Sequence, residues 1–167
     1  LHPFAEKPAR TDFSEDKLNV EWQYLRNPIR ENYSLTERKG WFRISASPYA
    51  LDEAKTVSMI CRRQTEHNFV AATRMEFSAS GENEEAGITL IQNNTHHYDL
   101  LLKKAKGQNV VQLRVKVGSL SYIAAEKQIK GNSDQTGVSI NTALGRMRYA
   151  ILNIRRMADE HDIVLTM

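Results

Sequence analysis

Carboxylate side chains are the first candidates for chemistry in this sequence of 167 residues. Glu82, Glu84 and Glu85 lie close together, but Gly81 and Asn83 interrupt them, and this composition is typical of a solvated turn. Acid–base hydrolysis by paired carboxylates needs two carboxyl groups held at a defined separation inside a cleft, and no pattern here identifies such a pair. We therefore expect no catalytic residues within this chain.

The remaining reactive side chains give weaker signals. His96 and His97 are adjacent, so on a strand their rings point to opposite faces and only one of them can join a given site. Cys61, the only cysteine, follows the apolar run VSMI, which favours a buried structural thiol over a nucleophile. Nucleophile elbows, phosphate-binding glycine loops and HExxH zinc motifs are absent. The glycosylation patterns NYS at Asn32 and NNT at Asn93 are short enough to arise by chance.

Aromatic side chains could serve as platforms for sugar rings, because a pyranose face is apolar while its hydroxyl groups need hydrogen-bond partners. The possible platforms are Trp22, Tyr24, Trp41 and Tyr98. Each of them lies in or beside a predicted strand, where packing in the core is the commoner role. The aromatic residues alone therefore leave sugar binding as one option among several.

The elements that must position these residues are mostly strands. Residues 69–77 alternate between apolar and mixed positions, and residues 111–117 repeat the same period of two, so both are predicted to be half-buried strands. Shorter candidates are residues 41–46, 56–62, 86–92 and 98–103, separated by the turn-rich pieces ASGENEE, QNNTH and KAKGQN. Many short strands at near-regular spacing favour an antiparallel β-sandwich or jelly roll.

The two ends of the chain differ from the middle. Residues 1–10 contain two prolines and mixed charges, and we interpret them as a linker from an upstream domain. Residues 11–140 form the expected sandwich domain. From Leu144 onward, apolar residues recur at steps of three and four as far as Ala158, which predicts an amphipathic helix in a tail of residues 141–167. The simplest role for its apolar face is to cover an exposed sheet.

Composition excludes several classes of partner. Lysine and arginine number 23 against 20 acidic residues, and the net charge of +3 is spread along the chain, which argues against a nucleic-acid partner. No stretch approaches the roughly 18 to 20 apolar residues needed to cross a bilayer, and the first residues lack the hydrophobic centre of a secretion signal. We expect a soluble chain without a membrane partner, and its compartment stays open.

A family resemblance rests on several strings that occur in a fixed order. They are TDF, WQYLRNP, YSLTERKGWFRI, CRRQTEHNFVAATRMEF and EEAGITLIQNNTHHYDLLL. Together they resemble the C-terminal module that follows the five-bladed propeller of glycoside hydrolase family 43 β-xylosidases and α-arabinofuranosidases. The resemblance covers about residues 11–130. It implies a concanavalin A-like jelly roll that carries no catalytic residues and has the catalytic propeller domain as its partner.

The resemblance also implies where this module contacts substrate. In the family, the turn after a pair of arginines projects toward the propeller and can lend a side chain to the mouth of the pocket. Here the pair is Arg62 and Arg63. The turn then consists of Gln64, Thr65, Glu66, His67 and Asn68. Several xylosidases carry an aromatic residue where this chain has His67, so this turn either hydrogen-bonds a sugar hydroxyl through His67 or only contacts the neighbouring domain.

Two features of the family are only partly matched. Asp12 corresponds to an acidic position that in some members helps to bind a structural calcium ion, whereas calcium needs six to eight oxygen ligands and a lone carboxylate is weak evidence. No cofactor is otherwise required. The closing strands that the family places after KQIKG have no counterpart motifs in residues 133–167. Either the helical tail or a partner covers the opening, or the tail reflects a divergent or altered reading of the gene.

The resemblance therefore implies a non-catalytic accessory domain of a glycoside hydrolase acting on xylo- or arabino-oligosaccharides in plant polysaccharide breakdown. Two alternatives remain. An independent carbohydrate-binding module would need exposed aromatic rings, and Trp22, Trp41 and Tyr98 are the candidates. A purely structural or oligomerisation module would show a large exposed apolar patch and no sugar binding.

Overall fold

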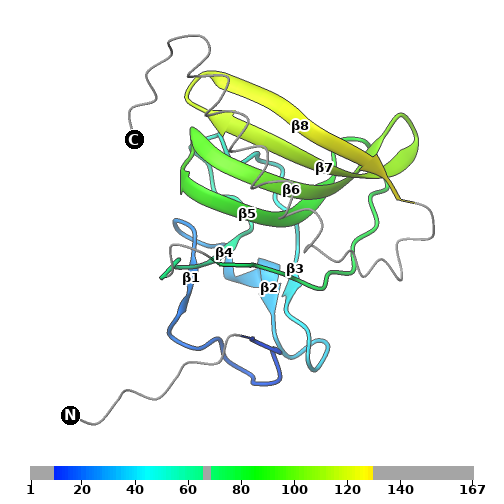
Figure 1. Ribbon diagram of the computed structural model, residues 1–167. Helices are drawn as coiled ribbons and strands as arrows, with labels where there is room; N and C mark the ends of the chain where they lie inside the picture. The colour runs from blue at the N-terminus through cyan, green and yellow to red at the C-terminus, as the bar shows by residue number, and fades with distance from the viewer. Residues whose placement is uncertain (1–9, 66–68, 130–167) are drawn as a thin grey trace. The chain divides into compact units, whose positions relative to one another are not determined.

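The computed structural model describes residues 10–65 and 69–129, and its chain divides into two compact units, residues 1–65 and 66–167. The regular elements of the first unit are β1 (Trp22–Tyr24), the 3-10 helix η1 (Arg30–Asn32), β2 (Tyr33–Ser34), β3 (Arg43–Ile44) and β4 (Ile60–Arg62). Those of the second unit are β5 (Glu85–Asn93), β6 (His96–Ala105), β7 (Gln108–Val117) and β8 (Leu120–Gln128). Apart from η1, every regular element in the described residues is a strand (Figure 1).

The first unit contains two small antiparallel sheets. Strand β1 pairs with β4, with Gln23 opposite Cys61, and β2 pairs with β3, with Tyr33 opposite Ile44. A run of ring contacts supports these short strands. It comprises Trp22–Phe13, Phe13–Phe42, Phe42–Tyr33 and Tyr33–Tyr24, with centroid separations of 5.9, 5.5, 5.9 and 4.8 Å. Each such pair contributes about 0.5 to 1.5 kcal/mol beyond its buried area, so the aromatic residues compensate for the small number of backbone bonds.

The second unit is a four-stranded antiparallel meander in the order β5-β6-β7-β8 (Figure 1). Its central pair is in continuous register from His96 opposite Val117 to Ala105 opposite Gln108. The turn that joins these two strands is Lys106–Gly107, with φ of +50° and +75°. Positive φ at both positions is the mark of the two-residue type I′ hairpin turn, and glycine at the second position adopts it without a steric penalty.

The two faces of the four-stranded sheet differ in polarity. On one face Leu100 and Leu113 form a buried pair. Partly buried side chains of the same sheet pack against it, namely Ile88, Leu90, Tyr98, Val111, Ala124 and Ala125. The other face carries the opposite parity of each strand, including Glu85, His97, Asp99 and Arg114. The period of two in the sequence thus separates an apolar face from one that carries these charged groups together with the buried Leu101 and Val110; we call the second one the polar face.

Most of the predicted strands are present with shifted ends. The strands predicted at residues 86–92, 98–103 and 111–117 correspond to β5, β6 and β7, and those at 41–46 and 56–62 shrink to β3 and β4. The prediction at residues 69–77 is wrong, because no residue from 69 to 84 is in a strand. Phe69 is 42% exposed and Val70 is 71% exposed, so neither of the two alternating sets of side chains is buried at the start of this segment. Alternation without a pairing partner does not make a strand.

Strand β8 was not predicted, and its sequence explains why. Tyr122, Ile123, Ala124 and Ala125 are apolar in succession, which breaks the period of two. The break matches a β-bulge, because Arg114 is opposite Ile123 and Leu113 is opposite Ala125, leaving Ala124 as the extra residue. The predicted linker at 1–10 lies almost wholly outside the described residues, and the helical tail at 141–167 lies entirely outside them.

Candidate functional site

The turn predicted to contact substrate follows directly on β4. Gln64 and Thr65 are exposed, whereas Glu66, His67 and Asn68 lie outside the described residues. The strand that leads into the turn, β4, pairs with β1, and Arg62 lies opposite Trp22 in this pairing. Arg62 also forms an ion pair of 2.6 Å with Glu21. The start of the turn is therefore anchored, and its contribution to a pocket stays a prediction.

The three predicted sugar-stacking residues are all half-buried and all have protein contacts. Trp22 lies 5.9 Å from Phe13, and its Nε1 donates a hydrogen bond of 3.3 Å to Thr11 Oγ1. The guanidinium of Arg38 lies 4.3 Å from the centre of the Trp41 ring. Tyr98 packs on the apolar face of the four-stranded sheet, against the cluster that includes Leu100. Sugar stacking by these rings stays a prediction, and a sugar would compete with these protein contacts for the same rings.

Asp12, the predicted calcium ligand, forms a local turn. Its Oδ1 accepts hydrogen bonds from the backbone N and the hydroxyl of Ser14 at 3.1 and 2.8 Å. The hydroxyl bond, then the backbone bond, lowers the pKa of the Asp12 carboxyl below its ordinary value. Within residues 10–65 and 69–129, no group of three or more His, Cys, Asp and Glu side chains is arranged to hold a metal ion. Calcium binding by Asp12 therefore stays a prediction without further ligands in this region.

The acidic loop and its neighbours do not converge on one point. Glu84 accepts hydrogen bonds from the backbone N and hydroxyl of Ser80 at 2.8 and 2.6 Å, which lowers the pKa of its carboxyl. Glu82 accepts one of 3.2 Å from the backbone N of Gly107. Glu85 binds Arg114 instead. The three carboxylates have three different local partners, so they tie the loop to itself and to the sheet.

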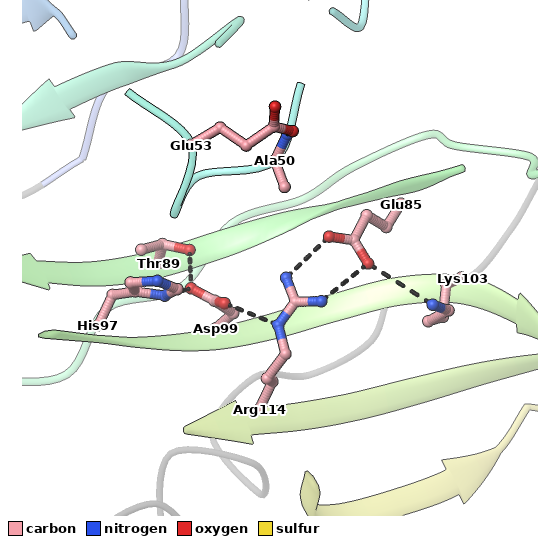
Figure 2. A network of polar contacts seen from close by, with 8 residues as sticks. All are labelled: Ala50, Glu53, Glu85, Thr89, His97, Asp99, Lys103 and Arg114. Carbon is pink, nitrogen blue, oxygen red and sulfur yellow. Dashed lines mark hydrogen bonds and ion pairs between the residues drawn. The ribbon is translucent and has the colours of Figure 1, made fainter. Parts of the chain in front are cut away.

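A charged network that we had not predicted lies on the polar face of the second unit (Figure 2). Its centre is Arg114 on β7, which donates from Nη2 and Nη1 to the two carboxylate oxygens of Glu85 on β5, at 2.7 and 3.2 Å. The Nε of the same guanidinium donates to Asp99 Oδ2 on β6 at 3.1 Å. Lys103 Nζ lies 3.6 Å from Glu85 Oε2. One arginine thus bridges two carboxylates on two neighbouring strands.

Asp99 is the buried member of this network, with 1% of its surface exposed. Besides Arg114, its carboxylate accepts a hydrogen bond of 2.8 Å from Thr89 Oγ1 and lies 2.8 Å from His97 Nδ1. His97 is 3% exposed, and its Nε2 has no hydrogen-bond partner among the described residues. The carboxylate needs its donors because an unpaired charge at this depth would be strongly unfavourable.

The electrostatics of Arg114 follow from the same contacts. Burial disfavours its charge, but the hydrogen bond to Glu85 and the charges of Glu85 and Asp99 outweigh burial and raise the pKa of the guanidinium. The Arg114 guanidinium pairs with the carboxylates of both Glu85 and Asp99, and Asp99 is buried from solvent. This arrangement serves to join β5, β6 and β7.

A sequence signal for this network exists in the strand parity. On β6, every second residue lies on the polar face, and these include His97, Asp99 and Lys103. On β7, Gln112 and Arg114 lie on the same face of the sheet. As expected from their adjacency, His96 and His97 separate. His96 Nδ1 lies 3.2 Å from Asn93 Oδ1, whereas His97 is buried beside Asp99. The missing information was the register between strands, which only pairing supplies.

No helix in the described part of the chain has the length and apolar character needed to span a membrane. All strand pairs in the described residues are antiparallel, which is the pairing found in β-sandwich modules.

Comparisons with known proteins assign the module to a family. Residues 10–154 match the family described as the beta-xylosidase C-terminal concanavalin A-like domain. The chain is 35% identical over 113 residues to a non-reducing end alpha-L-arabinofuranosidase of Bacteroides ovatus, covering 68% of this chain and 21% of that protein. It is 32% identical over 128 residues to a xylan 1,3-beta-xylosidase of a Vibrio species, covering 75% of this chain and 23% of that protein.

The structural comparison agrees with the sequence comparison. A solved structure described as Bacteroides ovatus xyloglucan PUL GH43B matches with a TM-score of 0.74 at 32% identity, covering 78% of this chain and 26% of that chain. The chain therefore belongs to the family of concanavalin A-like C-terminal domains of beta-xylosidases, and its fold is the antiparallel β-sandwich of that family. It spans about a fifth of the length of the two curated relatives.

Proposed function

We propose that this chain is the accessory domain of a family 43 glycoside hydrolase, docked on a catalytic five-bladed propeller and shaping its substrate pocket. The observation that carries the proposal is the family match over residues 10–154 together with the small share of each relative that it covers, 21% and 23%. The relatives are an arabinofuranosidase and a xylosidase, so the proposed substrates are arabino- or xylo-oligosaccharides from plant polysaccharides.

The polar side chains of the described residues support a non-catalytic role. Among the described residues, the most deeply buried carboxylate is Asp99, which is held by Thr89, His97 and Arg114. The neighbouring carboxylate, Glu85, binds the same Arg114. A pair that hydrolyses glycosides must reach the sugar from two sides. The carboxylate chemistry is accordingly assigned to the propeller.

The turn at Gln64–Asn68 is the proposed point of contact with substrate. Its first residues are exposed amide and hydroxyl side chains that leave from a strand anchored by Arg62. Amide and imidazole groups can hydrogen-bond sugar hydroxyls without taking part in bond cleavage. Such contacts would orient the substrate and leave the reacting groups to the other domain.

Substitution of this turn in the full-length enzyme tests the contact. For Gln64→Ala and His67→Ala we expect KM for a xylo- or arabino-oligosaccharide to rise several-fold while kcat stays within about twofold, because only binding contacts are removed. Gln128→Ala is the matched control, since Gln128 is also an exposed amide but ends β8. Steady-state kinetics on the four proteins would contradict the pocket role if all had the same KM.

Binding to the isolated chain separates this function from its main alternative. An accessory domain that completes a pocket holds only part of the substrate and should show no measurable affinity for xylo-oligosaccharides in calorimetry. Saturable binding to the chain alone, lost in Trp22→Ala or Trp41→Ala, would instead identify an independent carbohydrate-binding module.

A further inference from the structure

Two asparagines in this chain begin the acceptor pattern for N-linked glycans, and the structure separates them. Asn93 is the last residue of β5, and Asn94 and Thr95 form the turn to β6; Asn93 and Thr95 are exposed. Asn32-Tyr33-Ser34 instead runs from η1 into β2. A glycan is bulky and needs an acceptor at the surface, so the two positions differ in their ability to carry one.

The side chain of Asn93 is held in a turn that leaves its nitrogen available. Its Oδ1 accepts hydrogen bonds from the backbone N and the hydroxyl of Thr95, at 2.9 and 3.0 Å. His96 Nδ1 lies 3.2 Å from the same oxygen and 3.1 Å from Thr95 Oγ1. Every hydrogen bond found for this side chain in the described residues uses the oxygen, so none occupies Nδ2.

This geometry also favours the chemistry of glycan transfer. Donors that converge on Oδ1 draw electron density from the amide and make the Nδ2 hydrogens more acidic. The hydroxyl of Thr95 is already in contact with the amide that must react. A register shift in the pairing of β5 with β6, between Ile91 and Asn93, sets the turn apart from the regular ladder.

Asn32 has none of these properties. Its Nδ2 donates to Ser58 Oγ at 3.2 Å, so the nitrogen that would carry a sugar is engaged in the fold. Its backbone is also committed, because its N donates to the Ile29 carbonyl at 3.1 Å and its carbonyl accepts from Ser45 N at 2.8 Å. A glycan on Asn32 would require breaking a half-buried contact of the first unit.

We infer that Asn93, and not Asn32, is an acceptor site for an N-linked oligosaccharide when the chain enters a compartment that holds an oligosaccharyltransferase and a lipid diphosphate-linked oligosaccharide. In the transfer, Asn93 Nδ2 forms a bond to the anomeric carbon and gives up a proton. The bond from that carbon to the lipid diphosphate breaks, and the diphosphate leaves with the electron pair.

Expression of the full chain behind a secretion signal in a eukaryotic host tests the inference. Intact mass before and after treatment with an N-glycan amidase should show one glycan on the wild type and on Asn32→Gln, with Asp in place of Asn93 after release. Asn93→Gln and Thr95→Val should lose the glycan completely, while Thr95→Ser should keep it. The chain retained in the cell is measured as well as the secreted chain, so that a secretion defect does not hide the result.

A glycan found on Asn32, or an unmodified Asn93 in chain that has entered the secretory lumen, would overturn the inference. The outcome does not depend on the proposed accessory role, because neither the propeller nor a substrate takes part in the measurement.

Discussion

At the scale of single residues, Arg114 is the side chain on which most of the polar face depends. It neutralises Asp99, which is 1% exposed, and binds both oxygens of Glu85. Removing one partner of such a network leaves a buried charge uncompensated, which costs far more than the pair contributes when intact. The network therefore restricts substitution on the polar face.

Replacement of Arg114 tests this dependence. Arg114→Met should lower the free energy of unfolding by about 2 to 4 kcal/mol, below the full range for a buried pair because 26% of the Arg114 side chain is exposed. Urea unfolding followed by circular dichroism measures the change. Arg43→Met is the control, since Arg43 pairs with Glu37 where both side chains are mostly exposed, and its effect should stay below about 1 kcal/mol. Equal losses in the two variants would mean that the network adds nothing.

Cys61 gives a second residue-level prediction with a defined sign. Burial raises the pKa of its thiol above the ordinary value, so at neutral pH a smaller fraction is thiolate than in the unfolded chain. Alkylation should therefore be slower in the native chain than in urea, and its rate should rise at higher pH. Because Cys61 is the only cysteine, mass spectrometry of the labelled chain reports this residue alone. Equal native and unfolded rates would show that the thiol is open to solvent.

At the scale of elements, the long strands β5, β6 and β7 were predictable and the short strands β1 and β2 were not. Strands β5, β6 and β7 follow from alternation sustained over several residues, as in Val111–Val117. Strands β1 and β2 comprise three and two residues, too few for a period to appear. They form because distant segments supply partners, as when Met59 N donates to the hydroxyl of Tyr33 at 2.9 Å. Local sequence carries no record of such contacts.

The candidate site divides in the same way. The resemblance located the turn after Arg63, and the described part of that turn is exposed as a contact surface requires. The Glu85–Arg114–Asp99 network was missed because its members are separated by 14 and 15 positions in the chain. They meet only when three strands pair in one register. Residues 69–77 show the converse error, since their alternation is real but no strand pairs with it.

Gly87 is the position where pairing of these elements is most sensitive. A Cβ at Gly87 would overlap the carbonyl oxygen of Leu100 and lie 2.9 Å from the Leu101 Cα. Gly87→Ala should therefore separate β5 from β6 and cost at least about 3 kcal/mol. At Gly81 nothing lies within 4 Å of the added atom, so Gly81→Ala should change stability by less than about 0.5 kcal/mol. Thermal unfolding of both variants measures the difference, and a Gly87→Ala variant as stable as Gly81→Ala would disprove the close approach.

At the scale of the whole molecule, the central claim is that this domain acts through a catalytic neighbour. The chain supplies a sandwich whose buried polar groups join strands, and the matched part covers only 21% and 23% of the two curated relatives. A domain that is docked shares its stability with its neighbour, whereas one tethered by a linker unfolds alone. Weakening the sandwich should therefore weaken the enzyme.

The most direct test compares the full-length enzyme with its Gly87→Ala, Arg114→Met and Gly81→Ala variants, measuring the temperature at which hydrolysis of an aryl xyloside or arabinofuranoside is lost. We predict that Gly87→Ala and Arg114→Met lower this temperature by several degrees and that Gly81→Ala leaves it unchanged, because the substitutions act on the propeller through the docked domain. The same temperature in all four proteins, with calorimetry showing the sandwich alone destabilised, would contradict the account.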